Sequence, residues 1–481
     1  MDKLIVKHSG IVVPNYELGE VPKLESNLST YDSVYFTERP MAYDYDADRS
    51  TLYIPRGMTI SEAEDLLRRT AEYDYDCNES DDTLIRLLKE PRNTIQQRSI
   101  AYLLGEGDFK YTKTKSQIAL NLDTGDGKTY CVIAALSFMR TKSLIMTHID
   151  NIKHQWIDSI KKFTDTSEDY ILDVKGSKVI DKVMSIPSNK LPWKTYLVNR
   201  KTLNSYAKKH GWKAVEEFIE HIKVGVKVFD EAHIEFETMM NIDFHSNVKK
   251  TIYLTANFER SEFRENKVFK YSFRNIPTFG VSTYDEKERH IIYVPVFFNS
   301  RPSMEAKMGM RGIKGWLDKN KYSDYLTDKE VFFNVLKQML DTCISQEGRI
   351  LVLTSKISST EVVADFIRET YPGKQVGVYN SSIDNKLKEE IKENYQIISS
   401  TPKSMGTGTD LPGLRFVLNF DVYSSNVLAN QVSGRLRPLP NGDNTFFFEF
   451  VDSGVPDVGK MYKKRLPIFK KKCKSIKQIN L

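Results

Sequence analysis

Short apolar runs separated by amphipathic stretches constrain the fold more than any other feature of this sequence. After about residue 88 the runs are SQIALNL, KSLIMTH, TYLVN, VKVFD and KTIYLTA, and a second series contains IIYVPVF, GRILVLTS, KQVGVYN, QIISST, FVLNF and TFFFEFV. Runs of this kind, rich in β-branched residues, are typical of buried parallel strands joined by crossover helices. The sequence therefore predicts an α/β protein with two parallel-sheet domains in tandem.

The first 88 residues follow a different pattern. LIVKHSGIVV, SVYF and TLYIP are β-like, and SEAEDLLRR predicts a helix with Ser61 as its cap. We therefore expect a small α+β domain over residues 1–88, a first α/β domain over 89–287 and a second over 288–481. The polar run STYDEKERH marks the expected boundary between the two α/β domains.

Charge is divided unevenly along the 481 residues. Residues 1–90 hold 19 acids and 10 bases, although the whole chain carries a net charge of +6. The last 22 residues, from Lys460, contain nine Lys or Arg and no acid. Such a tail favours a polyanion such as nucleic acid, although a solvated helix face has the same composition.

The sequence gives no sign of a membrane or secretory protein. No apolar stretch approaches the length that crosses a bilayer, and the start, MDKLIVKHSG, lacks the apolar core of a signal peptide. The four cysteines are widely spaced and form no CxxC pattern. We expect a cytoplasmic protein with reduced cysteines and no membrane partner.

A glycine-rich loop, LDTGDGKT at 122–129, lies between the apolar run IALNL and the helix-like segment YCVIAALSFM. In this setting backbone N–H groups at a helix N-terminus would close around phosphates, Lys128 would reach the β- and γ-phosphates of a nucleotide, and the Thr129 hydroxyl would bind Mg²⁺. Leu122 replaces the first glycine of the usual G-x-x-x-x-G-K-[ST] pattern, and a relaxed GxGKT also occurs in ordinary turns. The predicted nucleotide contacts in this loop are Thr124, Gly125, Asp126, Gly127, Lys128 and Thr129.

A second motif, VKVFDEAH, ends an apolar run with two adjacent carboxylates, Asp230 and Glu231. At the carboxyl end of a buried strand they would lie beside the phosphate loop, where open α/β sheets bind ligands. We expect Asp230 to hold Mg²⁺ and Glu231 to orient and deprotonate the attacking water. Acids at a helix N-terminus are the alternative interpretation of this motif alone.

Together these motifs resemble superfamily 2 helicases and translocases of the DEAH-box kind, over most of residues 90–460. The resemblance implies two RecA-like domains that hydrolyse ATP with Mg²⁺. YLTANFER at 253–260 resembles the motif that couples the nucleotide to nucleic acid, which implies coupling roles for His233, Thr255 and Ala256. RNTIQQRSIAYLL resembles the adenine-contacting segment, with Gln96 as the contact and Gln97 as the alternative.

Further segments resemble elements that contact the nucleic-acid backbone. SLIMTHIDNIKHQW and YLVNRKTL imply contacts by Thr147 and Arg200, although both could be surface loops, and ILVLTSK implies contacts by Thr354 and Ser355. In TPKSMGTGTDLPGLR the implied nucleic-acid contacts are Thr401, Gly406 and Thr407, and the implied ATP contacts are Gly408 and Asp410.

NQVSGRLRP at 430–438 resembles the QxxGRxxR motif, with Gln431, Gly434 and Arg435 in register. The final arginine arrives one position early, at Arg437. An arginine presented to the γ-phosphate stabilises the transition-state charge. We expect Gln431 to contact ATP, and Arg435 and Arg437 to share the arginine role.

Within the superfamily, the small N-terminal domain, TLYIPRGM at 51–58 and the ending FEFVDSGVPDVGKMYKKRLPIFKKK resemble the UvsW-like branch of phage and viral DNA helicases. This resemblance implies branched, forked or duplex DNA as the partner, together with viral replication or recombination proteins. An RNA helicase remains the alternative, because the motor motifs do not exclude RNA. A non-catalytic nucleic-acid binding or annealing module is a third hypothesis.

Overall fold

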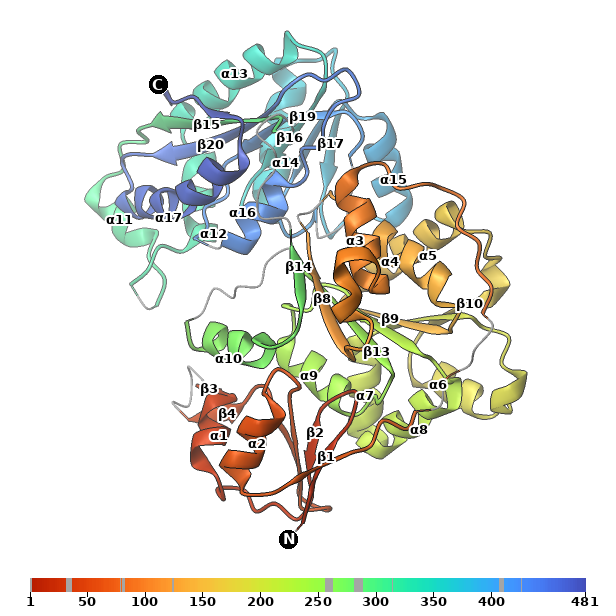
Figure 1. The fold of residues 1–481 in the computed structure, drawn as a ribbon. Coiled ribbons are helices and arrows are strands. Elements are labelled where there is room, and N and C mark those ends of the chain that lie inside the picture. Colours follow the sequence, from red (N-terminus) through yellow and green to blue (C-terminus); the bar gives the residue numbers. More distant parts are fainter. Residues whose placement is uncertain are drawn as a thin grey trace. The chain divides into compact units, whose positions relative to one another are not determined.

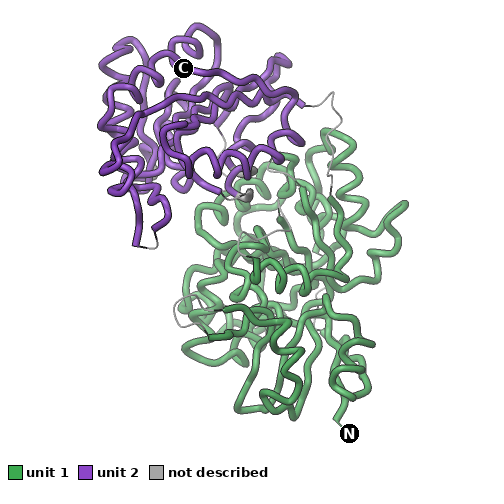
Figure 2. Tube along the Cα trace, turned by 90° about the vertical axis from the view of Figure 1, so that its left-hand side faces the viewer, with its two compact units in different colours: residues 1–281 green, residues 282–481 purple. Residues whose placement is uncertain are grey.

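The computed structural model describes residues 2–31, 37–77, 79, 83–122, 125–255, 263–280, 289–313, 315–405, 411–424 and 426–481. The chain divides into two compact units, Met1–Val281 and Ser282–Leu481, which Figure 2 shows in green and purple. Each unit has its own sheets and cores, and each is described separately below. In the described part of the chain, no helix is both long and apolar enough to cross a membrane.

The chain begins with a five-stranded mixed sheet of order β5-β6-β2-β1-β7, drawn in red in Figure 1. Its strands are β1 (Leu4–Val6), β2 (Ile11–Val13), β5 (Asp44–Asp46), β6 (Thr51–Ile54) and β7 (Ala71–Tyr73). Beside it lie α1 (Pro22–Asn27), α2 (Ile60–Leu67) and the antiparallel pair β3 (Ser29–Tyr31) and β4 (Glu38–Pro40).

The α2 cap differs from the prediction. The hydroxyl of Thr59 caps this helix by accepting a hydrogen bond from the Glu62 N–H at 3.2 Å. Ser61 lies inside the helix, so its prediction as the cap was wrong. Thr59 has extended backbone angles, as an N-cap residue requires, and it stands three positions before the N–H that it satisfies.

The larger sheet of the first unit has seven parallel strands in the order β10-β11-β9-β12-β13-β8-β14. The strands are β8 (Gln117–Asn121), β9 (Ser143–Thr147), β10 (Ile171–Val174), β11 (Thr195–Asn199), β12 (Val226–Phe229), β13 (Lys250–Thr255) and β14 (Thr278–Gly280). All five apolar runs predicted for this region form strands here. They are buried on both faces, which is why they are continuously apolar.

Helices cover both faces of this sheet. One face packs against α3 (Thr94–Leu104), α4 (Lys128–Met139) and α5 (Asp150–Phe163). The other packs against α6 (Ser177–Met184), α7 (Arg200–His210), α8 (Trp212–Ile222), α9 (Phe236–Phe244) and α10 (Phe263–Phe273). Short 3₁₀ turns lie at Gly107–Thr112, Glu168–Tyr170 and Ser188–Lys190.

The N-terminal sheet shares its core with this second face. One cluster of buried residues runs from Leu4 and Leu52 in the N-terminal sheet to Phe236 and Phe269 on α9 and α10. Hydrogen bonds reinforce the junction, since the Gln117 amide donates to the Ser9 carbonyl at 3.0 Å. The N-terminal sheet is therefore packed as part of the first unit.

The second unit contains an eight-stranded parallel sheet of order β17-β18-β16-β19-β20-β15-β21, with β22 also paired to β15. Its strands are β15 (Ile291–Phe298), β16 (Arg349–Leu353), β17 (Val376–Tyr379), β18 (Ile397–Ser400), β19 (Leu414–Asn419), β20 (Thr445–Asp452), β21 (Ser475–Ile476) and β22 (Ile479–Asn480). Its helices are α11 (Met304–Gly309), α12 (Lys319–Thr327), α13 (Glu330–Ile344), α14 (Ile357–Thr370), α15 (Asn385–Asn394), α16 (Asn426–Ser433) and α17 (Pro456–Lys472).

The basic C-terminal segment is largely helix α17, which is anchored on the sheet. Its Arg465 forms a fully buried ion pair with Glu449 of β20, and its Phe469 stacks on Tyr293 of β15 with ring centroids 4.1 Å apart. Its lysines, by contrast, are exposed at positions 460, 463, 464, 470 and 471. The helix therefore combines an anchored apolar face with a cationic solvent face.

Candidate active site

The phosphate loop follows β8 and leads into α4. Gly127 caps α4 with φ +87° and Gly125 has φ +108°, both in the left-handed region that favours glycine. A Cβ on Gly127 would also lie 2.3 Å from Nε2 of Gln96. The first-turn N–H groups of α4 therefore follow a tight glycine loop, the arrangement that binds phosphate.

Gln96 holds this loop from α3. Its side chain is buried, accepts a hydrogen bond from the Arg92 N–H at 3.0 Å, and donates to the Asp126 carbonyl at 3.1 Å. Gln97, the alternative adenine contact, is exposed. Gln96 is thus fixed next to the phosphate loop, and its contact with adenine stays a prediction.

Lys128 and Thr129 occupy the first turn of α4. The Lys128 ammonium donates to the Leu122 carbonyl at 2.7 Å, so it folds back over the loop. Thr129 is half-buried on the same turn. Thr124 lies outside the described residues.

Three strand ends meet at the carboxyl edge of the sheet. Because the sheet order places β13 between β12 and β8, Asp230 after β12 and the phosphate loop after β8 lie about 10 Å apart, two strand spacings. The Asp230 carboxylate is buried and accepts a hydrogen bond from the Trp156 indole at 2.8 Å. Burial and the neighbouring Glu231 carboxylate raise the pKa of Asp230 to about 6, against the opposing effects of Trp156, Lys128 and Arg200.

Glu231 has a strained backbone. Its φ is +48°, in the left-handed region that non-glycine residues rarely adopt. Its Oε2 atom is buried and makes no hydrogen bond among the described residues, while it lies 3.4 Å from His233 Nδ1. Strain of this kind is concentrated at functional sites.

The predicted coupling residues also lie together. His233 Nδ1 and the Thr255 hydroxyl, at the end of β13, share a 2.9 Å hydrogen bond, and both side chains are buried. The pair connects the DEAH segment to the neighbouring strand. Ala256 and Asn257 lie outside the described residues.

Arg200 lies in the interior of the first unit. Its side chain is completely buried, and its guanidinium donates to the carbonyls of Asp230 at 2.6 Å, Ile234 at 2.5 Å and Glu231 at 3.2 Å. Burial lowers its pKa to about 10, even though nearby carboxylates oppose that shift. Arg200 supports the DEAH loop, and its contact with the nucleic-acid backbone stays a prediction.

Thr147 is also fully buried, at the end of β9, and its hydroxyl donates to the Ile149 carbonyl at 3.1 Å. This hydroxyl stabilises the turn into α5. The contact of Thr147 with nucleic acid stays a prediction.

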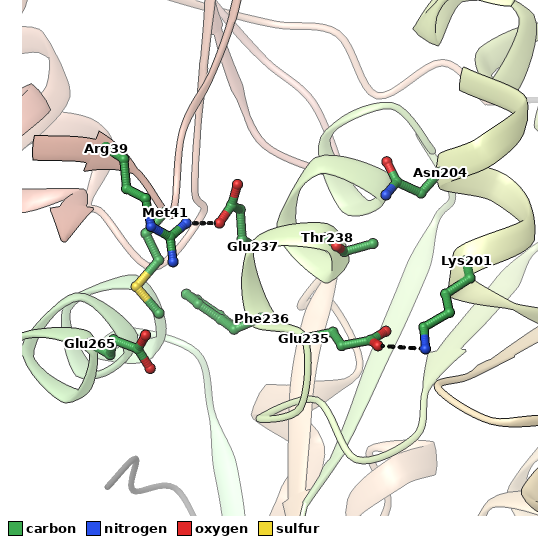
Figure 3. A pocket seen from close by; sticks show the side chains of 9 residues that line it. All are labelled: Arg39, Met41, Lys201, Asn204, Glu235, Phe236, Glu237, Thr238 and Glu265. Atoms are coloured by element: carbon green, nitrogen blue, oxygen red, sulfur yellow. Dashed lines mark hydrogen bonds and ion pairs between the residues drawn. The ribbon is translucent and has the colours of Figure 1, made fainter. Parts of the chain in front are cut away.

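A pocket of about 280 Å³ lies next to the DEAH segment, on the side of α7 (Figure 3). Lys201 of α7 pairs with Glu235 at 3.3 Å, and Arg39 of β4 pairs with Glu237 of α9. Glu265 adds a third carboxylate to the lining. Because both cations are already paired with acids, the pocket is poorly suited to phosphate.

In the second unit, the residues predicted to contact the nucleic-acid backbone come directly after the adjacent strands β16 and β18. Thr354 is buried, with its hydroxyl donating to the Lys356 carbonyl at 3.3 Å. Ser355 is half-buried and donates to the Asp421 carboxylate. Thr401 is buried and accepts a hydrogen bond from the Ser404 N–H at 3.0 Å.

The remaining predicted residues of this unit lie around α16. Arg435 is buried and Arg437 is half-buried, just after the helix ends. The side chain of Gln431 is not among those described. Gly406, Thr407, Gly408 and Asp410 lie outside the described residues.

Sequence reasoning missed Trp156 as the partner of Asp230. The signal was present, because Ile152, Trp156 and Ile160 are spaced four apart on α5 and are all buried. That spacing predicts a core-facing indole. A buried indole N–H requires an acceptor.

Comparisons with known proteins agree with this fold. Residues 86–260 match the family model "Type III restriction enzyme, res subunit", and residues 332–437 match "Helicase conserved C-terminal domain". No curated protein matches the chain significantly.

Two solved structures illustrate the similarity. One is a fragment described as an HsdR subunit of a type I restriction enzyme from Vibrio vulnificus YJ016, with a TM-score of 0.53 and 12% identity, covering 80% of this chain and 68% of that one. T4 UvsW aligns over 100% of both chains with a TM-score of 0.37 and 14% identity. With its two matched helicase-type regions and its two parallel sheets, this chain has the tandem RecA-like domains of a superfamily 2 helicase.

Proposed function

We propose that this protein is an ATP-dependent DNA helicase or translocase of the DEAH-box, UvsW-like kind that unwinds or remodels branched DNA. The observation that carries the proposal is the edge where β8, β13 and β12 end, which combines a phosphate loop, a buried carboxylate pair and a strained glutamate. A protein that only bound nucleic acid would have no use for this combination.

Residues of the first unit are suited to bind ATP with Mg²⁺. The N-terminus of α4 would receive the phosphates, and Lys128 would exchange its bond to the Leu122 carbonyl for the β- and γ-phosphates. The Asp230 carboxylate and Thr129 hydroxyl are hard oxygen ligands, which Mg²⁺ prefers. When bound, Mg²⁺ neutralises charge that develops on the transferred phosphoryl group.

Glu231 is proposed as the residue that orients the attacking water and accepts its proton. Its buried Oε2 atom has no competing hydrogen bond among the described residues. The left-handed backbone and the three Arg200 hydrogen bonds fix the loop that carries it. A positioned carboxylate with an oxygen that makes no hydrogen bond among the described residues supports this role.

Coupling to nucleic acid is proposed to pass through the His233–Thr255 hydrogen bond, because it joins the DEAH segment to the end of β13. Arg435 and Arg437 are proposed to share the arginine role at the γ-phosphate. Roles for Thr354, Ser355 and Thr401 at the nucleic-acid backbone remain proposals that rest on the motif resemblance.

DNA is the proposed partner, and the exposed lysines of α17 support a polyanion in general. An RNA helicase is the alternative, since phosphate contacts do not distinguish the two polymers. Viral replication or recombination proteins are proposed as partners only on the UvsW-like features of the sequence. A cytoplasmic location is proposed from the lack of a signal-peptide-like or membrane-spanning stretch in the sequence.

The decisive experiment is ATP hydrolysis by wild type, Lys128→Ala, Glu231→Gln and the control Lys178→Ala, which alters an exposed lysine on α6. Each is assayed alone and with forked, duplex or single-stranded DNA, or with RNA. DNA-stimulated hydrolysis that persists in the control and is lost in both site variants supports the proposal. Stimulation by RNA alone favours the alternative, and no hydrolysis with any polymer refutes a motor.

A further inference from the structure

A second pocket, of about 180 Å³, lies where three segments of the first unit meet. The β6–α2 loop contributes Arg56 and Thr59, the segment just before β8 contributes Lys115 and Ser116, and the α10–β14 loop contributes Asn275. We propose that this pocket binds a backbone phosphate of a nucleic-acid strand, so that the acidic N-terminal segment presents a local cationic contact.

Charge distinguishes this pocket from the one beside the DEAH segment. Arg56 and Lys115 are its charged lining residues, and no acid lines it. Neither cation forms an ion pair with a carboxylate among the described residues. Within that part of the chain, the Arg56 side chain donates a hydrogen bond only to the Tyr75 hydroxyl, at 3.4 Å. Two cations without counter-charges in a concave site are suited to a phosphate group.

His8, which lies next to the pocket, is also close to cationic side chains. His8 Nδ1 lies 2.7 Å from the Ser116 hydroxyl. Burial lowers the pKa of His8, and the charges of Arg56, Lys227 and Lys249 lower it further, against the raising effect of its hydrogen bond at Tyr75.

The backbone holds Arg56 in a fixed position. Met58 N–H donates to the Pro55 carbonyl at 3.1 Å, which closes a turn with Arg56 at its second position. Gly57 packs so tightly that a Cβ there would lie 1.7 Å from the Ser272 carbonyl oxygen, and the Asn275 amide donates to the Gly57 carbonyl at 2.7 Å. A fixed turn loses little conformational entropy when it binds a ligand.

Lys115 is also on a supported segment. Its carbonyl accepts a hydrogen bond from the ammonium of the half-buried Lys250 at 2.8 Å. Burial lowers the pKa of Lys250 to about 8. The Lys115 side chain remains exposed, so it can reach a ligand while its backbone is anchored.

Position and size separate this pocket from the ATP site. It lies at the start of β8, whereas the phosphate loop follows the end of β8, so the five-residue strand places the two at least about 13 Å apart. A volume of about 180 Å³ is below the roughly 300 Å³ of typical small-molecule sites. It suits one phosphate group better than a whole nucleotide.

The test compares Arg56→Gln/Lys115→Gln with Lys178→Gln/Lys182→Gln, which makes the same charge change on exposed lysines of α6. Fluorescence anisotropy measures binding of labelled forked DNA, without nucleotide, from 50 to 200 mM salt. Each phosphate contact contributes about 0.9 to the slope of log K against log salt. The pocket holds one phosphate, so losing that contact should shrink the ratio of wild-type to variant affinity about 3.5-fold over this range. The control should keep the wild-type slope.

An unchanged slope in the pocket variant overturns the proposal, even if that variant loses binding of inorganic phosphate in a parallel calorimetric titration. Arg56→Lys retains the charge and should retain most of the slope; if it behaves like the double variant, the effect comes from misfolding and the proposal fails. The inference rests on the proposed nucleic-acid binding. If the wild-type protein binds no nucleic acid, the proposed function is refuted. If the wild type binds and the variant keeps the wild-type slope, only the proposed phosphate site is refuted.

Discussion

Replacing Arg200 by methionine tests whether this side chain supports the DEAH loop. Methionine keeps an unbranched apolar stem of similar length but removes every donor. The carbonyls of Asp230 and Ile234 receive no other hydrogen bond among the described residues, whereas the Glu231 carbonyl keeps the Ile234 N–H at 2.9 Å. Each unsatisfied buried carbonyl costs about 1–3 kcal/mol. Because a buried guanidinium is also removed, we expect a net loss of about 3 kcal/mol in the free energy of unfolding.

The same change should slow hydrolysis. A non-glycine residue in the left-handed region costs about 1–3 kcal/mol, and the hydrogen bonds from Arg200 help to keep Glu231 there. Without them the loop can relax. A displacement of about 1 Å at a catalytic group costs on the order of 100-fold in rate. We expect kcat to fall by about that factor with little change in KM, because the phosphate loop on β8 and α4 is untouched.

Two assays measure these effects. ATP turnover gives kcat and KM, and urea denaturation followed by tryptophan fluorescence gives stability. Trp156, Trp193 and Trp212 all belong to the first unit, so this signal reports mainly on the relevant part. A midpoint about 1 M lower in urea is expected. Arg200→Lys, which keeps a cationic donor, should be intermediate. If Arg200→Met keeps normal stability and kcat but loses nucleic-acid affinity, the reasoning is wrong and Arg200 acts at the surface.

Three further outcomes are expected. Gly127→Ala should abolish ATP binding, measured by equilibrium titration, because alanine is strained at φ +87° and its Cβ has no room; retained affinity would contradict the loop geometry. Burial lowers the pKa of His245, but hydrogen bonds to Asp44 and Glu216 outweigh it and raise the pKa above 6.5. That stabilisation is full below pH 6.5 and lost as pH rises through the folded pKa. The wild-type urea midpoint should therefore fall from pH 6 to pH 8.5 by more than that of His245→Gln, and equal falls would count against the ion pairs. Thr255→Val should reduce DNA-stimulated hydrolysis several-fold more than basal hydrolysis, and an equal loss of both would argue against coupling.

The sequence determined the local elements because their signals are local. Eleven apolar runs became strands at or within a few residues of their predicted positions, since a strand buried on both faces must be continuously apolar. The glycine-rich turn between β8 and α4 was predictable for the same reason. Gly125 and Gly127 favour positive φ angles, which both residues adopt, and Lys128 begins the helix that follows them.

The sequence did not determine contacts between distant segments. Arg200 follows a strand in a position that looks like a surface loop, yet the packing of α7 against the DEAH segment turns it inward. The His233–Thr255 bond depends on β12 and β13 being neighbours in the sheet. Strand order is set by the packing of the whole domain, not by any one run of residues.

The cationic pocket is the clearest case of tertiary control. Its residues come from positions 56, 115 and 275, and the segment that contributes Arg56 is acidic overall. The net negative charge of that segment, taken from the sequence alone, predicts that it repels a polyanion. Once the shared core brings the three segments together, two cations lie in one hollow without an acid in its lining. Charge along a sequence is one-dimensional, whereas a ligand meets the charges that folding places side by side.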